Sequence, residues 1–186
     1  VFIDNYIVRV QADQISAKAR QYSKFSKAMS RTFDKSFFDG TGTSKDFKGI
    51  NALITEGLGQ TVEAGTNGAV LTLDMLDEGW DSLRGQSAPD ALLMNRFLRR
   101  KINALARAGN FSLIDVGTDV FGRQVNIYNG TPIRIIGDDI DGTAILAFDE
   151  TQGSSSVTSS IYAIAYGTDE NVYGILGLGG SFDVKD

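Results

Sequence analysis

The chain has 186 residues, of which 42% are hydrophobic, and a formal net charge of -5 at pH 7. This length suits one domain, or two small lobes sharing a core that needs no disulfide or metal. Because the sequence has neither Cys nor His, it excludes disulfides, thiolate metal sites and catalytic triads built on Cys or His. We expect no transmembrane helix, since no long apolar run occurs, and no signal peptide.

Charge is distributed unevenly along the chain. Residues 1–48 contain nine Lys and Arg against five Asp and Glu, a local charge of +4. Residues 49–186 contain nine against eighteen, a local charge of -9. A basic N-terminal segment therefore precedes an acidic body, which is typical of a surface facing nucleic acid, and equally of a solvated helix face with incidental charge.

The N-terminal part is predicted to be a strand followed by one long helix. Residues 1–10 are rich in β-branched and aromatic residues, which favours a strand; because Val1 already lies in it, we expect a fragment or a processed form. Over residues 12–38, apolar and small residues recur every three or four positions, which predicts a helix about 40 Å long. Asp13 is its predicted N-cap and Gly40 follows its C-terminal end. Its cations are Lys18, Arg20, Lys24, Lys27, Arg31 and Lys35.

Two glycine-rich stretches separate this helix from the next one. Residues 39–54 are predicted to form a loop that continues into a strand or turn from Phe47 onwards. Residues 56–70 are expected to be irregular. A second helix is predicted over residues 71–85, with Thr72 as its N-cap and an apolar stripe on one side.

The clearest pattern in the chain is a short strand followed by a basic helix. Residues 91–94 are apolar on both sides, which is typical of a strand covered on both faces. Asn95 is the predicted N-cap of the helix, and Gly109 ends it. Apolar residues line one face of this helix, and the other face, most simply its solvated one, carries Arg96, Arg99, Arg100, Asn103 and Arg107.

The remaining segments are predicted to be rich in β-structure. Asn129 and Gly130 lie between two β-rich runs, which is the strongest short-range signal for a hairpin. Pro132 indicates that the second strand of this hairpin lies at an edge or is unpaired there. A buried strand is predicted at residues 143–149 and a mobile polar loop at residues 152–160. A second hairpin is predicted at residues 161–167 with 172–180.

No short motif in the sequence converges on a reaction. Residues 40–45 lack the spacing of a phosphate loop, and residues 174–180 are not a dinucleotide fingerprint. Residues 137–142 lack two main ligands of a calcium loop and are expected to form a polar turn. The sequence therefore predicts no catalytic, cofactor-binding or metal-binding residue, and no enzyme. A distant alternative is a carboxylate-dependent hydrolase using pairs drawn from Asp74, Asp77, Asp138, Asp139 and Asp141.

Weak motifs follow one another along nearly the whole chain. The first two are an acidic-Gly helix end with a Gly-Ile segment (residues 36–50) and a Thr-Leu-Asp helix (71–84). A Met-Asn strand end that opens a helix follows at 92–107. The last two are an aromatic-Gly-Arg-x-Val strand with a Gly-x-Pro-Ile strand (121–133) and a Ser-Ile-Tyr-Ala strand before Tyr-Gly-Ile (160–175). In number and order they resemble the major capsid proteins of tailed bacteriophages, which have the Hong Kong 97-type fold.

The resemblance implies an α+β protein of the Hong Kong 97-type major capsid fold, with a long spine helix, a peripheral domain and an axial domain. Residues 1–10 correspond to the end of an extended loop. Residues 11–70 and 158–186 correspond to the peripheral domain with its spine helix, and residues 71–157 to the axial domain.

The function implied by the resemblance is that of a structural subunit of a bacteriophage icosahedral capsid, which self-assembles into capsomers enclosing double-stranded DNA. The implied partners are copies of the same chain in pentamers and hexamers, scaffolding, portal or decoration proteins, and packaged DNA contacted non-specifically by the spine helix. No membrane and no cofactor are implied. The implied location is the virion, assembled in the bacterial host cytoplasm. An encapsulin-like compartment subunit of the same fold is the alternative.

Overall fold

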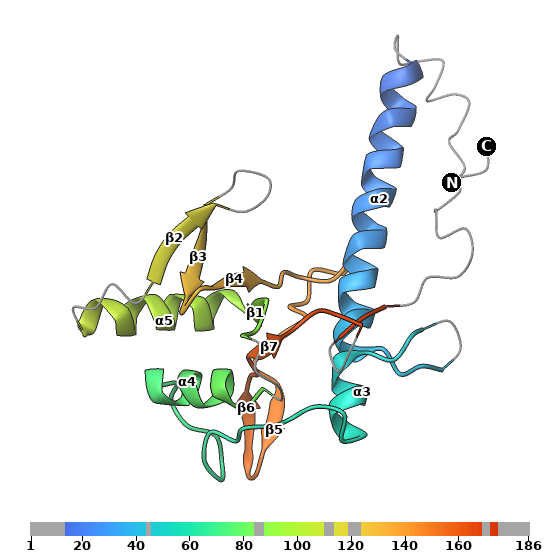
Figure 1. Cartoon of the computed structure of the whole chain (residues 1–186). Coiled ribbons are helices and arrows are strands. Elements are labelled where there is room, and N and C mark those ends of the chain that lie inside the picture. The colour runs from blue at the N-terminus through green and yellow to red at the C-terminus, as the bar shows by residue number, and fades with distance from the viewer. Residues whose placement is uncertain are drawn as a thin grey trace. The chain divides into compact units, whose positions relative to one another are not determined.

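A computed structural model of the protein describes residues 14–43, 46–83, 88–109, 114–118, 124–168 and 172–174 (Figure 1). These residues form an α+β protein whose chain divides into two compact units. The first unit combines Val1–Thr61 with Ile136–Ala147, and the second combines Val62–Ile135 with Phe148–Asp186. Four predicted features lie outside the described residues: the strand at residues 1–10, the N-cap at Asp13, residues 121–123 and residues 175–180.

The first unit is built on helix α2, Gln14–Asp39, which is 26 residues long. Its extent confirms the long helix predicted from the three- and four-residue spacing of apolar side chains, within the described residues. The helix ends where the Gly40 amide donates a hydrogen bond to the Ser36 carbonyl oxygen, 2.9 Å away. At this end the buried side chain of Phe38 packs edge-on against Phe37, with 5.3 Å between the ring centroids.

A tight turn with two glycines in contact joins α2 to the short helix α3, Ile50–Thr55. The Gly49 amide donates a hydrogen bond to the Gly40 carbonyl oxygen at 2.7 Å. The strand or turn predicted from Phe47 is therefore a turn that leads into a helix, and the strand is absent from the described residues. Six residues of helix are too few for an apolar period to distinguish helix from strand.

The predicted buried strand at residues 143–149 is wrong. This segment makes a single bridge, between Asp138 and Ala144, and then turns. Leu146 is its one buried apolar side chain. A short apolar run satisfies the strand template equally well when only one of its side chains enters a core, so the pattern alone was insufficient.

A mixed five-stranded sheet, in the order β2-β3-β4-β1-β7, organises the second unit. Strand β1 runs parallel to β4 on one side and antiparallel to β7 on the other. Each of its residues is buried, which confirms the predicted strand covered on both faces. The strands are β1 Ala91–Met94, β2 Ile114–Thr118, β3 Gln124–Tyr128, β4 Thr131–Ile135 and β7 Tyr162–Ile164.

Two capped helices cover this sheet, α4 (Leu73–Asp81) and α5 (Arg96–Ala108). The predicted N-caps are confirmed, because the Thr72 hydroxyl accepts from the Met75 amide at 3.2 Å and the Asn95 side-chain oxygen accepts from the Leu98 amide at 2.8 Å. Helix α4 ends at Asp81, earlier than predicted. Residues 58–70 contain no helix or strand, as expected.

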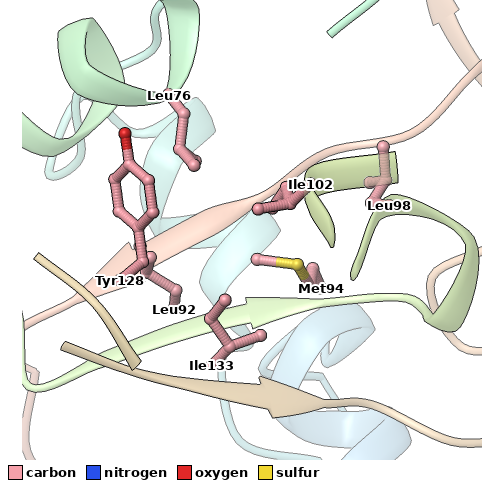
Figure 2. Close-up of a cluster of buried hydrophobic side chains, with 7 residues drawn as sticks. All are labelled: Leu76, Leu92, Met94, Leu98, Ile102, Tyr128 and Ile133. Atoms are coloured by element: carbon pink, nitrogen blue, oxygen red, sulfur yellow. The ribbon is translucent and has the colours of Figure 1, made fainter. Parts of the chain in front are cut away.

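The core of the second unit is formed by side chains from both helices and from the sheet (Figure 2). The two helices approach the same side of β1, with Leu76 coming from α4 and Leu98 and Ile102 from α5. The remaining members of the buried cluster are Leu92, Met94, Tyr128 and Ile133. This shared cluster fixes the two helices relative to each other.

The predicted hairpin around Asn129 and Gly130 is confirmed as β3 and β4. The φ angles of 46° at Asn129 and 82° at Gly130 are both positive, as a type I′ turn requires. Of the two alternatives inferred from Pro132, the edge position is wrong, because β4 lies between β3 and β1, and the lack of pairing at this residue is found on the β1 side. The missing N–H is tolerated since pairing with β1 begins one residue later, at Ile133.

The predicted mobile loop at residues 152–160 is instead a hairpin, with strands β5 (Glu150–Gln152) and β6 (Ser155–Thr158). The Asn67 side-chain oxygen accepts hydrogen bonds from the Ser154 amide at 2.9 Å and from its hydroxyl at 3.0 Å. These contacts anchor the turn, and its polar composition hid the strands. The hairpin predicted at residues 161–167 with 172–180 is described at residues 161–168 and 172–174, where Tyr166 and Val172 form one isolated bridge, which is parallel.

The predicted peripheral and axial domains divide the chain differently from these two compact units. Residues 136–147, which belong to the predicted axial domain, group with α2. Strand β7 of the predicted peripheral domain pairs with β1. The domain prediction concerns positions within a shell, and it stays a prediction.

Candidate nucleic-acid interface

Five cations of helix α2 form a continuous stripe. From Arg20 to Lys35, successive cations are four, three, four and four residues apart, which places them on one face of the helix. At about 1.5 Å per residue the stripe is about 22 Å long. All of its members are exposed. We call this set the α2 cation stripe; it consists of Arg20, Lys24, Lys27, Arg31 and Lys35.

Aromatic side chains occupy the opposite side of the same helix. Tyr22, Phe25 and Phe33 are 46%, 42% and 54% exposed, respectively. The Phe33 ring contacts Phe47 from the turn after α2, with 5.3 Å between the ring centroids. The cations therefore project away from the side of α2 that packs against this turn, which leaves the stripe accessible to a large anion.

Most members of the α2 cation stripe form no ion pair with a described residue. Among the described residues, none of Arg20, Lys24, Lys27 and Arg31 lies within ion-pair distance of a carboxylate. Unpaired cations in a row neutralise a phosphate backbone without reading bases. The geometry thus suits non-specific binding of a polyanion.

The last cation of the stripe is engaged in an ion pair within the first unit. Lys35 Nζ lies 2.9 Å from Asp139 Oδ2, and the two side chains are 53% and 5% exposed. Asp139 also accepts hydrogen bonds from the amides of Asp141 and Thr143, each at 2.9 Å. The polar turn predicted at residues 137–142 is confirmed, and Asp139 within it is buried.

The pKa of Asp139 is lowered by the Lys35 hydrogen bond and then by the Thr143 amide, and the pKa of Lys35 is raised by the hydrogen bond to Asp139. A carboxylate with a lowered folded pKa stabilises the protein above its unfolded pKa of about 3.9, and this stabilisation is lost as pH falls through the folded value. We expect Asp139→Asn to lower the melting temperature at pH 7, and we expect this deficit to shrink as the pH falls towards 3. Circular dichroism melts between pH 3 and 7 would check this.

The matched control for this pair is Glu56→Gln, which removes a carboxylate from the exposed Lys48–Glu56 ion pair of 2.6 Å. Because exposed pairs contribute little, its melting temperature should stay close to that of the original protein across this pH range. An Asp139→Asn deficit of the same size at pH 3 and at pH 7 would contradict the ion-pair explanation.

Two acids of the hydrolase alternative, Asp77 and Asp139, already accept hydrogen bonds within their own units. Asp74 and Asp77 lie on α4 in the second unit, whereas the acids of the 137–142 turn belong to the first unit. Asp77 accepts a hydrogen bond from the Tyr128 hydroxyl at 2.5 Å, and Asp139 is occupied as described above. The described residues hold no group of three side chains suited to a metal ion.

Sequence reasoning identified the cations of α2 and named Asp77 and Asp139 as candidate carboxylates, but it missed the partner of each acid. Lys35 and Asp139 are 104 positions apart, and Tyr128 and Asp77 are 51 apart. Burial, followed by the bond to Asp77, holds the pKa of Tyr128 well above its ordinary value. No spacing rule connects residues so distant in sequence, so only the tertiary structure brings these pairs together.

Comparisons with known protein families, with curated proteins and with solved structures find no match to this chain. Within the described ranges, no helix is both long and apolar enough to cross a membrane.

The α2 cation stripe gives a direct prediction for DNA binding. Neutralising Lys24, Lys27 and Arg31 to Gln should reduce the magnitude of the slope of log affinity against log salt by about 2.7, because each phosphate contact contributes roughly 0.9. Thermal stability should be unchanged, since these side chains are exposed. Fluorescence anisotropy with a DNA duplex at several salt concentrations measures the slope. Lys48→Gln, at a cation outside the stripe, is the control, and an unchanged slope in the triple variant would count against a DNA-facing role.

Proposed function

We propose that this chain is the structural subunit of a bacteriophage icosahedral capsid, a major capsid protein of the Hong Kong 97-type fold. It would self-assemble into pentameric and hexameric capsomers that enclose double-stranded DNA. The observation that carries the proposal is the ordered series of motifs, whose described parts fall on successive elements: α2 with its turn, α4, β1 with α5, the β3–β4 hairpin, and β7.

Packing at the first motif supports this proposal. The acidic-Gly end of α2 and the Gly-Ile segment contain Gly40 and Gly49, whose backbones are hydrogen-bonded to each other at 2.7 Å. A Cβ atom at Gly49 would lie 2.6 Å from the Gly40 nitrogen, closer than any side chain tolerates. The spacing of this motif therefore has a steric reason, and coincidence of composition is a poorer explanation for it.

The parts of the chain have distinct roles in the proposed shell. Helix α2 would be the spine helix, and its cation stripe would neutralise phosphates of packaged DNA without reading sequence. Residues 11–70 and 158–186 would form the peripheral domain, and residues 71–157 the axial domain around symmetry axes. Such a subunit requires shape and edge contacts and needs neither an active site nor a cofactor. It would bind copies of itself and scaffolding, portal or decoration proteins, and it would be located in the virion.

An encapsulin-like compartment subunit is the second candidate for the same arrangement. Such a subunit would bind cargo peptides on its inner face. Four cations of the α2 cation stripe form no ion pair with a described residue, which favours a polyanion over a peptide, so the phage shell is the better-supported function.

Negative-stain electron microscopy of the purified protein, with absorbance at 260 and 280 nm on the same fractions, tests the proposal. We expect closed shells or capsomer rings, with a 260 nm excess in the shells of a phage protein. Shells without that excess would favour the compartment subunit. A monodisperse monomer would contradict a shell function, and the acids of the 137–142 turn would then be assayed for hydrolase activity.

A further inference from the structure

Helix α4 carries charge of one sign on one side. It contains four acids and no base. Asp74, Glu78 and Asp81 are spaced by four and three residues, so they share one face of the helix, and all three are exposed. None of them forms an ion pair with a described residue. We call these three residues the α4 acidic stripe; the fourth acid, Asp77, is bonded to Tyr128.

Helix α5 carries the opposite charge in the same manner. It contains five bases and no acid. Arg96, Arg100 and Arg107 are spaced by four and seven residues, which again places them on one face, and all three are exposed. None of these three arginines forms an ion pair with a described residue. We call them the α5 basic stripe.

The two stripes belong to one rigid arrangement but do not neutralise each other. Both helices insert their apolar sides into the same core, through Leu76 from α4 and through Leu98 and Ile102 from α5 (Figure 2). The charged sides therefore face away from the core that the helices share. No ion pair links α4 to α5 within the described parts of the chain. Among the described residues, each stripe is therefore left without an ion-pair partner of opposite charge.

We propose that the α4 acidic stripe of one copy binds the α5 basic stripe of the next copy, head to tail, as the contact between neighbouring subunits. This inference rests on the proposed shell function, since a capsomer requires such a contact. An interface between two different patches forms a ring when its rotation closes. Complementary charge across it would also speed encounter and fix the register of the two copies.

An aromatic pair beside the basic stripe gives this contact an apolar component. The rings of Phe97 and Phe148 meet edge to face with centroids 5.1 Å apart, although the two residues are 50% and 41% exposed. The Arg100 guanidinium lies 5.2 Å from the centre of the Phe97 ring. Exposed aromatic rings next to arginine are characteristic of protein interfaces, where both residue types are enriched.

A second copy explains more of this surface than a nucleic acid does. A phosphate backbone would use the α5 basic stripe alone and would be repelled by the α4 acidic stripe on the same unit. Another copy satisfies both stripes at once, and each subunit in a ring then uses both. The α2 cation stripe, by contrast, lies on a helix without a complementary acidic stripe.

Reciprocal charge reversal tests this contact. The α4 variant carries Glu78→Lys and Asp81→Lys, and the α5 variant carries Arg96→Glu and Arg100→Glu. These positions place new lysines near the C-terminal end of α4 and new glutamates near the N-terminal end of α5, which the helix dipole favours, so both proteins should fold. We expect each variant alone to associate at least tenfold more weakly by analytical ultracentrifugation. An equimolar mixture, and the protein with all four changes, should recover association to within about threefold of the original protein.

Lys24→Glu with Lys27→Glu is the matched control, because it changes the net charge as much as the α5 variant does but alters the α2 cation stripe. It should leave association unchanged. If both the α4 variant and the α5 variant still associate, the inference is overturned, even where closed shells form. The inference is also overturned if the α5 variant loses DNA binding while its association is unchanged. Association that requires both stripes but yields no shell by electron microscopy supports the inference and contradicts the shell function. A monomeric original protein at every salt concentration overturns the inference.

Discussion

Replacing Leu92 by Asp should abolish the folded protein. Leu92 is 1% exposed and is the residue of β1 that pairs with Ile133 of β4 on one side and Ala163 of β7 on the other. A carboxylate there would be placed in the centre of the sheet, without a partner. Burying an unpaired charge costs several kcal/mol even after relaxation, which is comparable to the total stability of roughly 5–15 kcal/mol of a domain.

The measurement for this substitution is the yield of soluble protein, followed by circular dichroism and chemical denaturation of any soluble fraction. Leu92→Ala should fold but lose about 2–5 kcal/mol, because it creates a cavity without adding charge. Val70→Asp is the matched control, since Val70 belongs to the same unit and is 70% exposed. A Leu92→Asp protein with normal yield and melting temperature would contradict the central position of β1.

The segments that could be predicted from sequence are those whose pattern is local. Residues 91–108 combine an apolar run, a capping Asn and a strong helical period, and each of these signals acts within a few residues. The Asn129-Gly130 turn is equally local, because the positive φ angles depend on those two residues alone. Where the local signals agree on one structure, tertiary contacts seldom change it.

The segments that were wrongly predicted depend on partners far away in the chain. The β5–β6 hairpin has a polar sequence, and its turn is held by Asn67, which is 87 positions from Ser154. Leu146 enters a core although its neighbours do not. The short helix α3 follows a turn that exists because two glycines allow the backbones to touch. None of these causes leaves a period in the sequence.

The candidate surfaces show the same division. The spacing of the α2 cation stripe is visible in the sequence, as is the segregation of acids to α4 and bases to α5. What the sequence does not contain is the arrangement that leaves these charges unpaired. That arrangement follows from the shared core around Leu76 and Ile102, which orients the two helices, and from Asp139, which engages Lys35 of the α2 cation stripe.

Replacing Gly40 by Ala should lower the free energy of unfolding by about 3 kcal/mol, the upper end of the range for overpacking. A Cβ atom at this buried position would lie 2.2 Å from the Phe47 carbonyl oxygen and 2.4 Å from the Ser36 carbonyl oxygen. Both atoms belong to the backbone, so no side-chain rotation relieves the clash. The chain would have to separate the end of α2 from the turn, and the hydrogen bond from the Gly49 amide would be lost with it.

Urea denaturation of Gly40→Ala, with Gly137→Ala as the control, measures this effect. Gly137 belongs to the same unit, and a Cβ atom there meets no atom within 4 Å, so its substitution should change stability by less than about 0.5 kcal/mol. Gly49→Ala should destabilise as Gly40→Ala does, and the double variant should lose less than the sum, because both changes break the same contact. Equal stability of Gly40→Ala and Gly137→Ala would show that this turn tolerates a side chain, and the steric reason for the spacing of the first motif would then be wrong.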